Sequence, residues 1–178
     1  MRSEPVAFRL ELSDFGGFYE RTYHAAYRTA LGIVRDPALA ADVTQEAYVA
    51  AYRHRDRFRG EAPSMAWLHR IVVNQALAAL RRRPGSSPVA DLSPLMAPDG
   101  AGHSVTRLTL LQALDRLPAQ QRAAVVLRYY HDYDYATIAQ ILDTTSTNVG
   151  AMLSRALDRL KVAIEPEPEV GPVAAAGG

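Results

Sequence analysis

The chain has 178 residues, of which 48% are hydrophobic and 22% are charged, which is typical of a globular protein with one ordinary domain or two small ones. It contains no cysteine, which excludes disulfides, thiolate metal sites and cysteine nucleophiles. The net charge of +1 hides a basic stretch at residues 51–83, where 8 basic side chains outnumber 2 acidic ones, a balance that suits a polyanionic partner.

The chain shows no pattern of a membrane protein. Charged or polar side chains interrupt every apolar stretch well short of the roughly 20 residues that a spanning helix needs. Residues 1–13, which we assign as an N-terminal segment, lack the uninterrupted apolar core of a signal peptide. We therefore expect a cytoplasmic protein without membrane insertion.

Residues 14–83 predict a first helical domain. An apolar and aromatic stripe from Phe15 to Leu31 has the three- and four-residue spacing of an amphipathic helix. Asp36 and Pro37 predict the start of a second helix, because the carboxylate can cap free amides and proline suits the first helical position. The buried side of this second helix is expected to carry Leu39, Val43, Ala47 and Ala51.

The opposite face of that second helix carries Asp42, Gln45 and Glu46. Two carboxylates four residues apart repel each other on a helix, and no basic residue four positions away relieves either one. A solvated surface and a protein-docking face both fit this pattern. These three residues are the first candidates for function.

A basic segment, Arg53 to Gly60, follows the second helix, and Pro63 cannot continue a regular helix. Ser64 can then cap a third helix, which ends in Arg81-Arg82-Arg83. Three cations in a last turn stabilise the negative end of the helix dipole, and they also extend the basic patch. Both a structural role and a role in polyanion binding are therefore open.

The rest of the chain predicts a linker, a second helical domain and a tail. Residues 84–104 are rich in Pro, Gly and Ser and predict a flexible linker, whereas the acidic, Pro-rich residues 165–178 predict a disordered tail. Within residues 105–164, Leu117-Pro118 separates helices at about 105–116 and 119–130.

Two further helices in the second domain resemble a helix-turn-helix. Asp134 is placed to cap residues 135–142, Asp143 to Ser146 form a tight turn, and a longer helix runs from Thr147 to Lys161. No segment alternates with a period of two, so the predicted fold class is all-α, with two small helical domains joined by a linker. The apolar contact between the two helices is expected to come from Ile138, Ala139, Leu142, Val149 and Leu153.

Taken together, the two halves resemble the extracytoplasmic-function (ECF) sigma factors of the bacterial sigma-70 family. In the first half the matching residues are Ala41-Asp42-Val-Thr-Gln45-Glu46-Ala, Phe58-Arg-Gly60, Trp67-Leu68-His-Arg70-Ile71-Val-Val-Asn74 and Arg81-Arg82-Arg83. In the second they are Leu114-Asp-Arg-Leu117-Pro118, Val126-Leu127-Arg128-Tyr129, Tyr135-Ala-Thr-Ile138-Ala139-Gln-Ile-Leu142, Val149 and Leu153-Ser-Arg155-Ala156. The resemblance implies that residues 14–83 are sigma region 2 and residues 105–164 are sigma region 4.

The resemblance also implies a role for each candidate residue. The resemblance implies that polymerase docking uses Asp42, Gln45 and Glu46. Recognition and melting of the promoter's minus-ten element fall to Arg57, Phe58, Arg59, Gly60, Glu61, Ala62, Ser64, Trp67, Arg70, Asn74, Arg81, Arg82 and Arg83. Recognition of the minus-thirty-five element falls to Ser146, Thr147, Asn148, Ala151, Ser154, Arg155 and Arg159. For Trp67, a place in the core is preferred to base stacking.

The chain departs from the family pattern at several positions. Gly150 and Met152 stand where similar proteins carry cations on the recognition helix, which weakens the expected phosphate contacts. In the first half, Val73 and Ala78 replace a frequent Arg and Asp. The fold of the second domain is therefore better supported than its affinity for DNA.

The partners that the resemblance implies are core RNA polymerase, through its beta and beta-prime subunits, promoter DNA and an anti-sigma protein. A stand-alone helix-turn-helix regulator is the main alternative, but it does not explain the acidic face and the basic loop at residues 14–83. A helical enzyme is the third alternative. It has little support, because the five histidines lack metal-ligand spacing and the sequence contains no phosphate-binding loop. We expect no catalysis, no metal and no cofactor.

Overall fold

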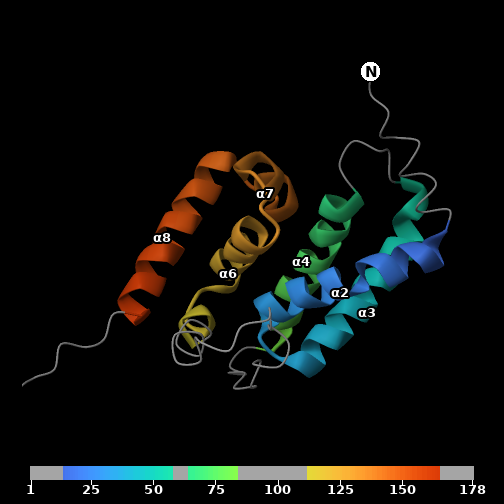
Figure 1. The fold of residues 1–178 in the computed structure, drawn as a ribbon, viewed down its shortest axis with the longest axis horizontal. Coiled ribbons are helices and arrows are strands. Elements are labelled where there is room, and N and C mark those ends of the chain that lie inside the picture. The colour runs from blue at the N-terminus through green and yellow to red at the C-terminus, as the bar shows by residue number, and fades with distance from the viewer. Residues whose placement is uncertain (1–13, 58–63, 84–111, 165–178) are drawn as a thin grey trace, which may run out of the picture.

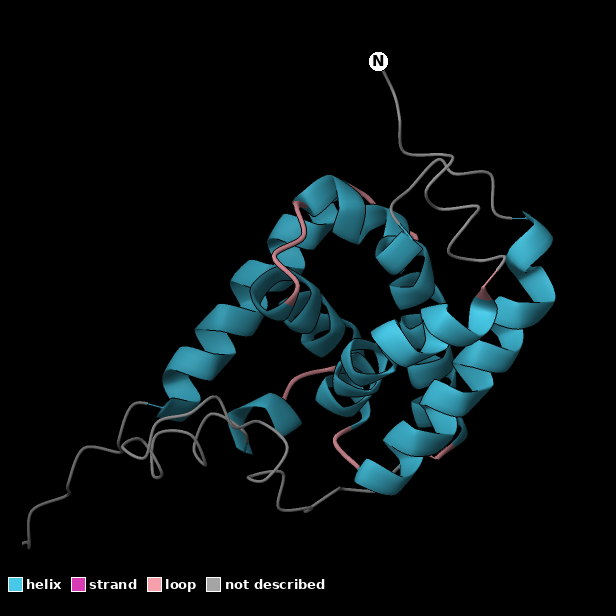
Figure 2. Cartoon of the chain, turned by 45° about the vertical axis from the view of Figure 1, so that its right-hand side comes forward, coloured by secondary structure: helices cyan, strands magenta, loops and turns pink. Residues whose placement is uncertain are grey.

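The computed structural model describes residues 14–57, 64–83 and 112–164, and the regular elements among them are all helical (Figure 1 and Figure 2). They include α2 (Phe15–Val34), α3 (Pro37–His54), the 3-10 turn η1 (Arg55–Arg57), α4 (Ser64–Arg82), α6 (Ala119–Val125), the π-helical segment η2 (Val126–Tyr130), α7 (Tyr135–Leu142) and α8 (Ser146–Ile164). The all-α prediction is confirmed for these residues. The predicted linker and tail lie outside them.

Helices α2, α3 and α4 pack against one another as a bundle. Side-chain caps begin the first two: Asp14 Oδ1 accepts a hydrogen bond from the Gly17 amide at 3.0 Å, and Asp36 Oδ1 accepts one from the Leu39 amide at 3.0 Å. The cap that the sequence predicts at Asp36, with Pro37 at the first helical position, is therefore confirmed. The four residues predicted to line the buried side of α3 are all in the core: Leu39, Val43, Ala47 and Ala51.

Helix α2 ends at Arg35, which adopts the left-handed conformation with φ 63° and hydrogen-bonds back to the Leu31 carbonyl at 2.9 Å. A non-glycine residue is uncommon in this region because its Cβ crowds the backbone. The Arg35 side chain is only 3% exposed, and its Nε lies 2.6 Å from Asp115 Oδ1. The contact with Asp115 therefore offsets part of the cost of this backbone conformation.

The C-terminal half contains the predicted helix-turn-helix. Asp134 Oδ1 accepts from the Thr137 amide at 2.7 Å and so caps α7. Asp143 adopts the left-handed conformation with φ 52° and ends α7, and α8 begins at Ser146. The turn between α7 and α8 therefore spans Asp143 to Thr145, one residue shorter than predicted. The helix expected at 119–130 is regular only to Val125 and continues as a π-helical segment.

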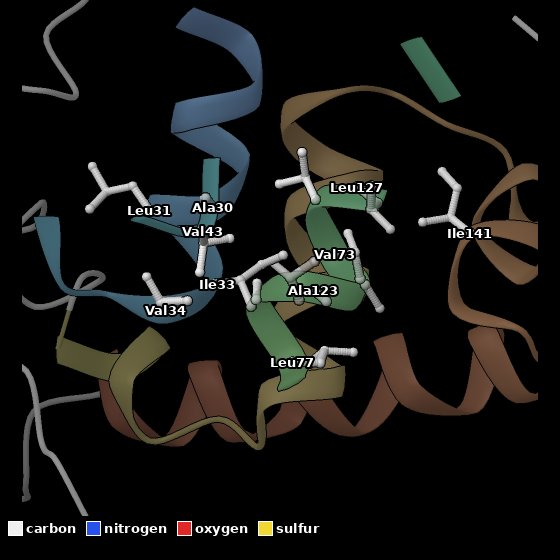
Figure 3. Packing of buried hydrophobic residues seen from close by; sticks show 14 of the residues in the cluster. Ala30, Leu31, Ile33, Val34, Val43, Val73, Leu77, Ala123, Leu127 and Ile141 are labelled. Carbon is white, nitrogen blue, oxygen red and sulfur yellow. The ribbon is translucent and has the colours of Figure 1, made fainter. Parts of the chain in front are cut away.

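The two halves pack against each other and share one apolar core. Helix α4 contacts α7, and α2 contacts α6 and η2, so α6 and α7 lie between α8 and the N-terminal bundle (Figure 1). Figure 3 shows side chains from both halves in the same cluster, including the fully buried Ile33 of α2, Leu127 of η2 and Ile141 of α7. The sequence predicts two domains joined by a flexible linker and gives no indication of this packing.

Candidate functional site

Helix α3 presents the candidate docking face to solvent. Asp42, Gln45 and Glu46 are all exposed and border a groove of about 450 Å³ that Gln75 of α4 also lines. Because the apolar side of α3 is buried against α2 and α4, the helix is held with this polar face outward. The structure thus brings the three predicted residues together on one accessible surface.

One ion pair modifies the docking face. Glu46 Oε2 lies 3.7 Å from Arg82 Nη2 of α4, and the two side chains are 56% and 61% exposed. The sequence reasoning considered only neighbours within α3 and missed this pair. Exposed pairs of this kind contribute about 0–1 kcal/mol, so a basic partner with closer contacts can replace Arg82.

The outward side of α4 carries Arg70, Asn74 and Arg81, which are exposed and separated by four and seven residues. That spacing places them on one face of the helix. Trp67 is half-buried and packs against the core, in keeping with its predicted place there. Helix α4 therefore presents a row of two cations and an amide, and Arg82 and Arg83 at its C-terminal end are also exposed.

The candidate base pocket, residues 58–62, lies outside the described residues. On its N-terminal side η1 ends at Arg57, and on the other side α4 begins at Ser64. Just before it, Tyr52 is 50% exposed and the Arg55 guanidinium lies 4.0 Å from its ring centroid. An exposed aromatic ring with a cation over it is suited to stacking on unpaired bases, and the sequence reasoning did not single it out.

Helix α8 separates its residues into a buried and an exposed face. Val149, Leu153 and Ala156 face the core, and so the opposite side is free to meet DNA. All the candidate recognition residues are exposed: Ser146, Thr147, Asn148, Ala151, Ser154, Arg155 and Arg159. Some of these side chains already have partners in the protein, since Asn148 Nδ2 donates to Thr144 Oγ1 at 2.9 Å and Arg159 Nη1 donates to Gln121 Oε1 at 3.1 Å.

Gly150 and Met152, which stand where similar proteins carry cations, lie in different environments. Met152 is 6% exposed, so its side chain packs in the core. Gly150 is half-buried, and a Cβ built on it would lie 3.5 Å from Cε2 of Tyr135 at the start of α7. Arg155, whose Nε donates to the Ala151 carbonyl at 3.1 Å, is then the exposed cation nearest the start of α8.

A buried histidine pair lies where the two halves meet. The rings of His69 on α4 and His131 after η2 are 3.9 Å apart, His69 Nδ1 is 2.9 Å from the Tyr133 hydroxyl, and His131 Nε2 is 2.7 Å from Thr29 Oγ1 on α2. The Thr29 hydroxyl donates its proton to the Ala25 carbonyl, so His131 donates to Thr29.

Burial lowers the pKa of His69 to about 3, with a further contribution from His131, and burial lowers the pKa of His131 to about 4. Both imidazoles are therefore neutral at neutral pH. The sequence reasoning dismissed the five histidines because none has metal-ligand spacing. Among the described residues, no group of three or more potential metal ligands lies together.

Comparison with known proteins identifies the class of this chain. The sigma-70 region 2 family matches residues 18–84 and the sigma-70 region 4 family matches residues 107–160. The chain is 34% identical over 148 residues to the ECF RNA polymerase sigma factor SigM of Mycobacterium tuberculosis, covering 82% of this chain and 74% of that protein. It is 31% identical over 148 residues to the RNA polymerase sigma-H factor of Pseudomonas aeruginosa, covering 75% and 77%.

Solved structures show the same fold. The sigma factor RpoE of Bartonella quintana, solved with the anti-sigma factor NepR, aligns with a TM-score of 0.68 at 23% identity and covers 87% of this chain and 99% of its own. CnrH, solved with the cytosolic domain of CnrY, aligns with a TM-score of 0.69 at 20% identity and covers 94% and 100%. The fold and the sequence matches define a sigma-70-type transcription factor. More specifically, the chain belongs to the ECF RNA polymerase sigma factors.

Proposed function

We propose that the protein acts as an alternative sigma factor that binds core RNA polymerase, recognises minus-thirty-five and minus-ten promoter elements and promotes melting of the downstream one. Its partners are the beta and beta-prime subunits of the polymerase and promoter DNA, and it works in the cytoplasm by binding, without catalysis. In the described part of the chain, no helix combines the length and apolar character needed to cross a membrane.

The accessible acidic face of α3 supports the docking role. Asp42 and Glu46 are both exposed, and the ion pair of Glu46 with Arg82 is exposed as well, so contacts within the protein stabilise these two charges little. A basic polymerase surface would supply opposite charges and speed the encounter. Gln45, between the two carboxylates on the same face, can both donate and accept hydrogen bonds.

The exposed faces of α4 and α8 support the DNA-binding roles. In this proposal the α4 row of Arg70, Asn74 and Arg81 follows the strand near the minus-ten element, while residues 57–62 and Ser64 receive an unpaired base. The exposed side of α8 enters the major groove, where Asn148 can read an adenine with two hydrogen bonds. To do so, its amide must exchange the hydrogen bond that it now donates to Thr144.

An anti-sigma protein is a further proposed partner. The RpoE and CnrH structures are complexes with the anti-sigma factor NepR and with the cytosolic domain of CnrY. Their common fold with this chain supports the same class of regulation here. The identity of such a partner would come from co-purification with the full chain.

The decisive experiment combines the purified protein with core polymerase and measures run-off transcription from promoter fragments selected out of genomic DNA. We expect a stable complex and defined transcripts. Specific binding of the protein alone to duplex DNA, with neither complex nor transcript, would instead identify a stand-alone regulator.

Asp42→Arg tests the docking face. Reversing this charge should weaken core binding by at least about 30-fold, equivalent to roughly 2 kcal/mol, without loss of helicity by circular dichroism. Glu20→Arg is the matched control, because Glu20 is an exposed acid on α2 outside the docking face. Equal core affinity for the two variants would remove the docking assignment.

A further inference from the structure

Two neighbouring hollows lie along the seam between α3 and α4. The groove of about 450 Å³ described above is lined by Asp42 and Glu46 of α3 and by Gln75 of α4, among others. A second hollow, of about 220 Å³, is lined by the same two carboxylates and, on the α4 side, by Arg82 and Arg83. Both hollows share the two carboxylates, so the C-terminal end of α4 borders the proposed docking face.

Helical geometry divides the arginines at the end of α4 between two surfaces. Gln75, Ala79 and Arg82 are separated by four and three residues, so they follow the edge of α4 that lines the two hollows. Arg81 instead lies seven residues after Asn74, in the exposed row proposed above to follow the minus-ten strand. Successive residues of a helix point about 100° apart. Arg82 therefore belongs to the border of the docking face and not to the row that contains Arg81.

The Arg82 side chain pairs with one of the docking carboxylates. Its Nη2 lies 3.7 Å from Glu46 Oε2, and the two side chains are 61% and 56% exposed. Because water competes for both charges at this exposure, the pair is weak and can be exchanged for another. A basic partner must take Glu46 from Arg82, and the guanidinium repels the partner's own cation while it stays nearby. Both effects lower the affinity of the docking face for a basic surface.

We propose that Arg82 is a built-in competitor of core polymerase: it occupies Glu46 in the free protein, lowers the affinity of docking, and acts on docking rather than on promoter DNA. The proposal rests on the sigma-factor function given above. The sequence resemblance assigns Arg82 to the minus-ten element, whereas the structure places it beside Glu46. A purely structural pair between α3 and α4 has the opposite sign, because its loss would loosen the docking face and weaken the complex.

Arg82→Gln tests the competitor. The full chain with this change is titrated with core polymerase, and the assembled complex is then titrated with a promoter fragment. We expect the core affinity to rise about two- to fivefold, equivalent to roughly 0.4–1 kcal/mol, and the promoter affinity to stay the same. The gain should be largest at low salt and shrink as salt screens the exposed charges. An unchanged or lowered core affinity would overturn the proposal.

Arg81→Gln is the matched comparison, because Arg81 is also exposed and occupies the same last turn of α4. This change should lower promoter affinity and reduce its salt dependence by about one phosphate contact, with little gain in core affinity. If both glutamine variants altered core and promoter affinity alike, Arg82 would be one more member of the DNA-binding row, and the competitor would be refuted. Circular dichroism checks that each variant keeps its helicity.

The pair itself is tested by changing both of its ends. In a Glu46→Gln background Arg82 has no carboxylate to occupy, so Arg82→Gln should raise core affinity much less than it does in the wild type. A gain of equal size in both backgrounds would show that Arg82 does not act through Glu46 and would overturn the proposal. Failure of the wild-type chain to bind core polymerase would refute the sigma function and the competitor together. Normal wild-type binding without a gain in Arg82→Gln would refute the competitor alone.

Discussion

Acidification should separate the two halves of the protein, which pack against each other in the structure; we call this packed arrangement the closed form and the separated one the open form. Burial lowers the pKa of His69 to about 3 and that of His131 to about 4, whereas a solvent-exposed histidine titrates near 6.5. The open form therefore binds protons that the closed form rejects. The stabilisation of the closed form is complete above about pH 6.5 and is lost as the pH falls from there toward the lowered values.

The loss of stability expected on acidification follows from this difference in histidine pKa. Each pH unit between the two pKa values is worth about 1.4 kcal/mol, so at about pH 5 a histidine that becomes exposed on opening destabilises the closed form by about 2 kcal/mol. His69, at 1% exposure, should contribute about this full amount, and the half-buried His131 should contribute less.

Other polar and charged side chains lie near the histidine pair. Arg128 bonds the Asp132 carboxylate, which is 95% exposed and faces solvent. Burial raises the pKa of Tyr133 to about 12, so its phenol stays neutral.

Energy transfer between two dyes measures this opening. Cysteines replacing the exposed Glu20 on α2 and Asp158 on α8 carry the dyes, and the native chain has no competing thiol. We expect transfer to fall between about pH 6.5 and 5 with helicity retained. His69→Phe should remove much of this response, and His24→Gln, at an exposed position, should not. A flat wild-type response, or an unaltered one in His69→Phe, would refute the reasoning.

Three further changes test local features of the C-terminal half. Asp134→Ala removes the hydrogen bond from the Thr137 amide that caps α7 and lowers the pKa of Asp134, so it should lower the midpoint of urea unfolding; an unchanged midpoint would contradict the cap. Gly150→Ala should raise stability by up to about 1 kcal/mol, because its Cβ makes an ordinary contact with Tyr135, and a loss of stability would show strain there. Arg155→Ala should lower the slope of log affinity for promoter DNA against log salt by about 1, whereas an unchanged slope would exclude a phosphate contact.

The helices and their local ends could be predicted from the sequence. Apolar spacing located the buried side of α3, and short-range pairs such as Asp36 with Leu39 and Asp134 with Thr137 set the starts of α3 and α7. These features depend on residues within about one turn of each other, which a linear pattern contains. For the same reason, the exposure of the docking and recognition faces followed from helical periodicity alone.

Other features depended on residues far apart in the chain. The stripe expected on α2 places Tyr19 on its apolar side, yet that ring is 41% exposed, because the aromatic rings of α2 and α3 form a cluster that reaches the surface. Met152, judged from the sequence as a missing cation on the DNA-binding side, is a buried core residue. Periodicity gives the face of a helix but not how much of that face its neighbours cover.

The sequence by itself determined the class of this protein and its helices, and it predicts the surfaces that we propose meet polymerase and DNA. Only the tertiary structure decided how the halves are placed. Arg35 meets Asp115 and His69 meets His131 across more than 60 positions, and no local preference predicts such a pair. The packing of the two halves depends on shape complementarity and on polar contacts such as that of Arg35 with Asp115, which exist only once the two surfaces meet.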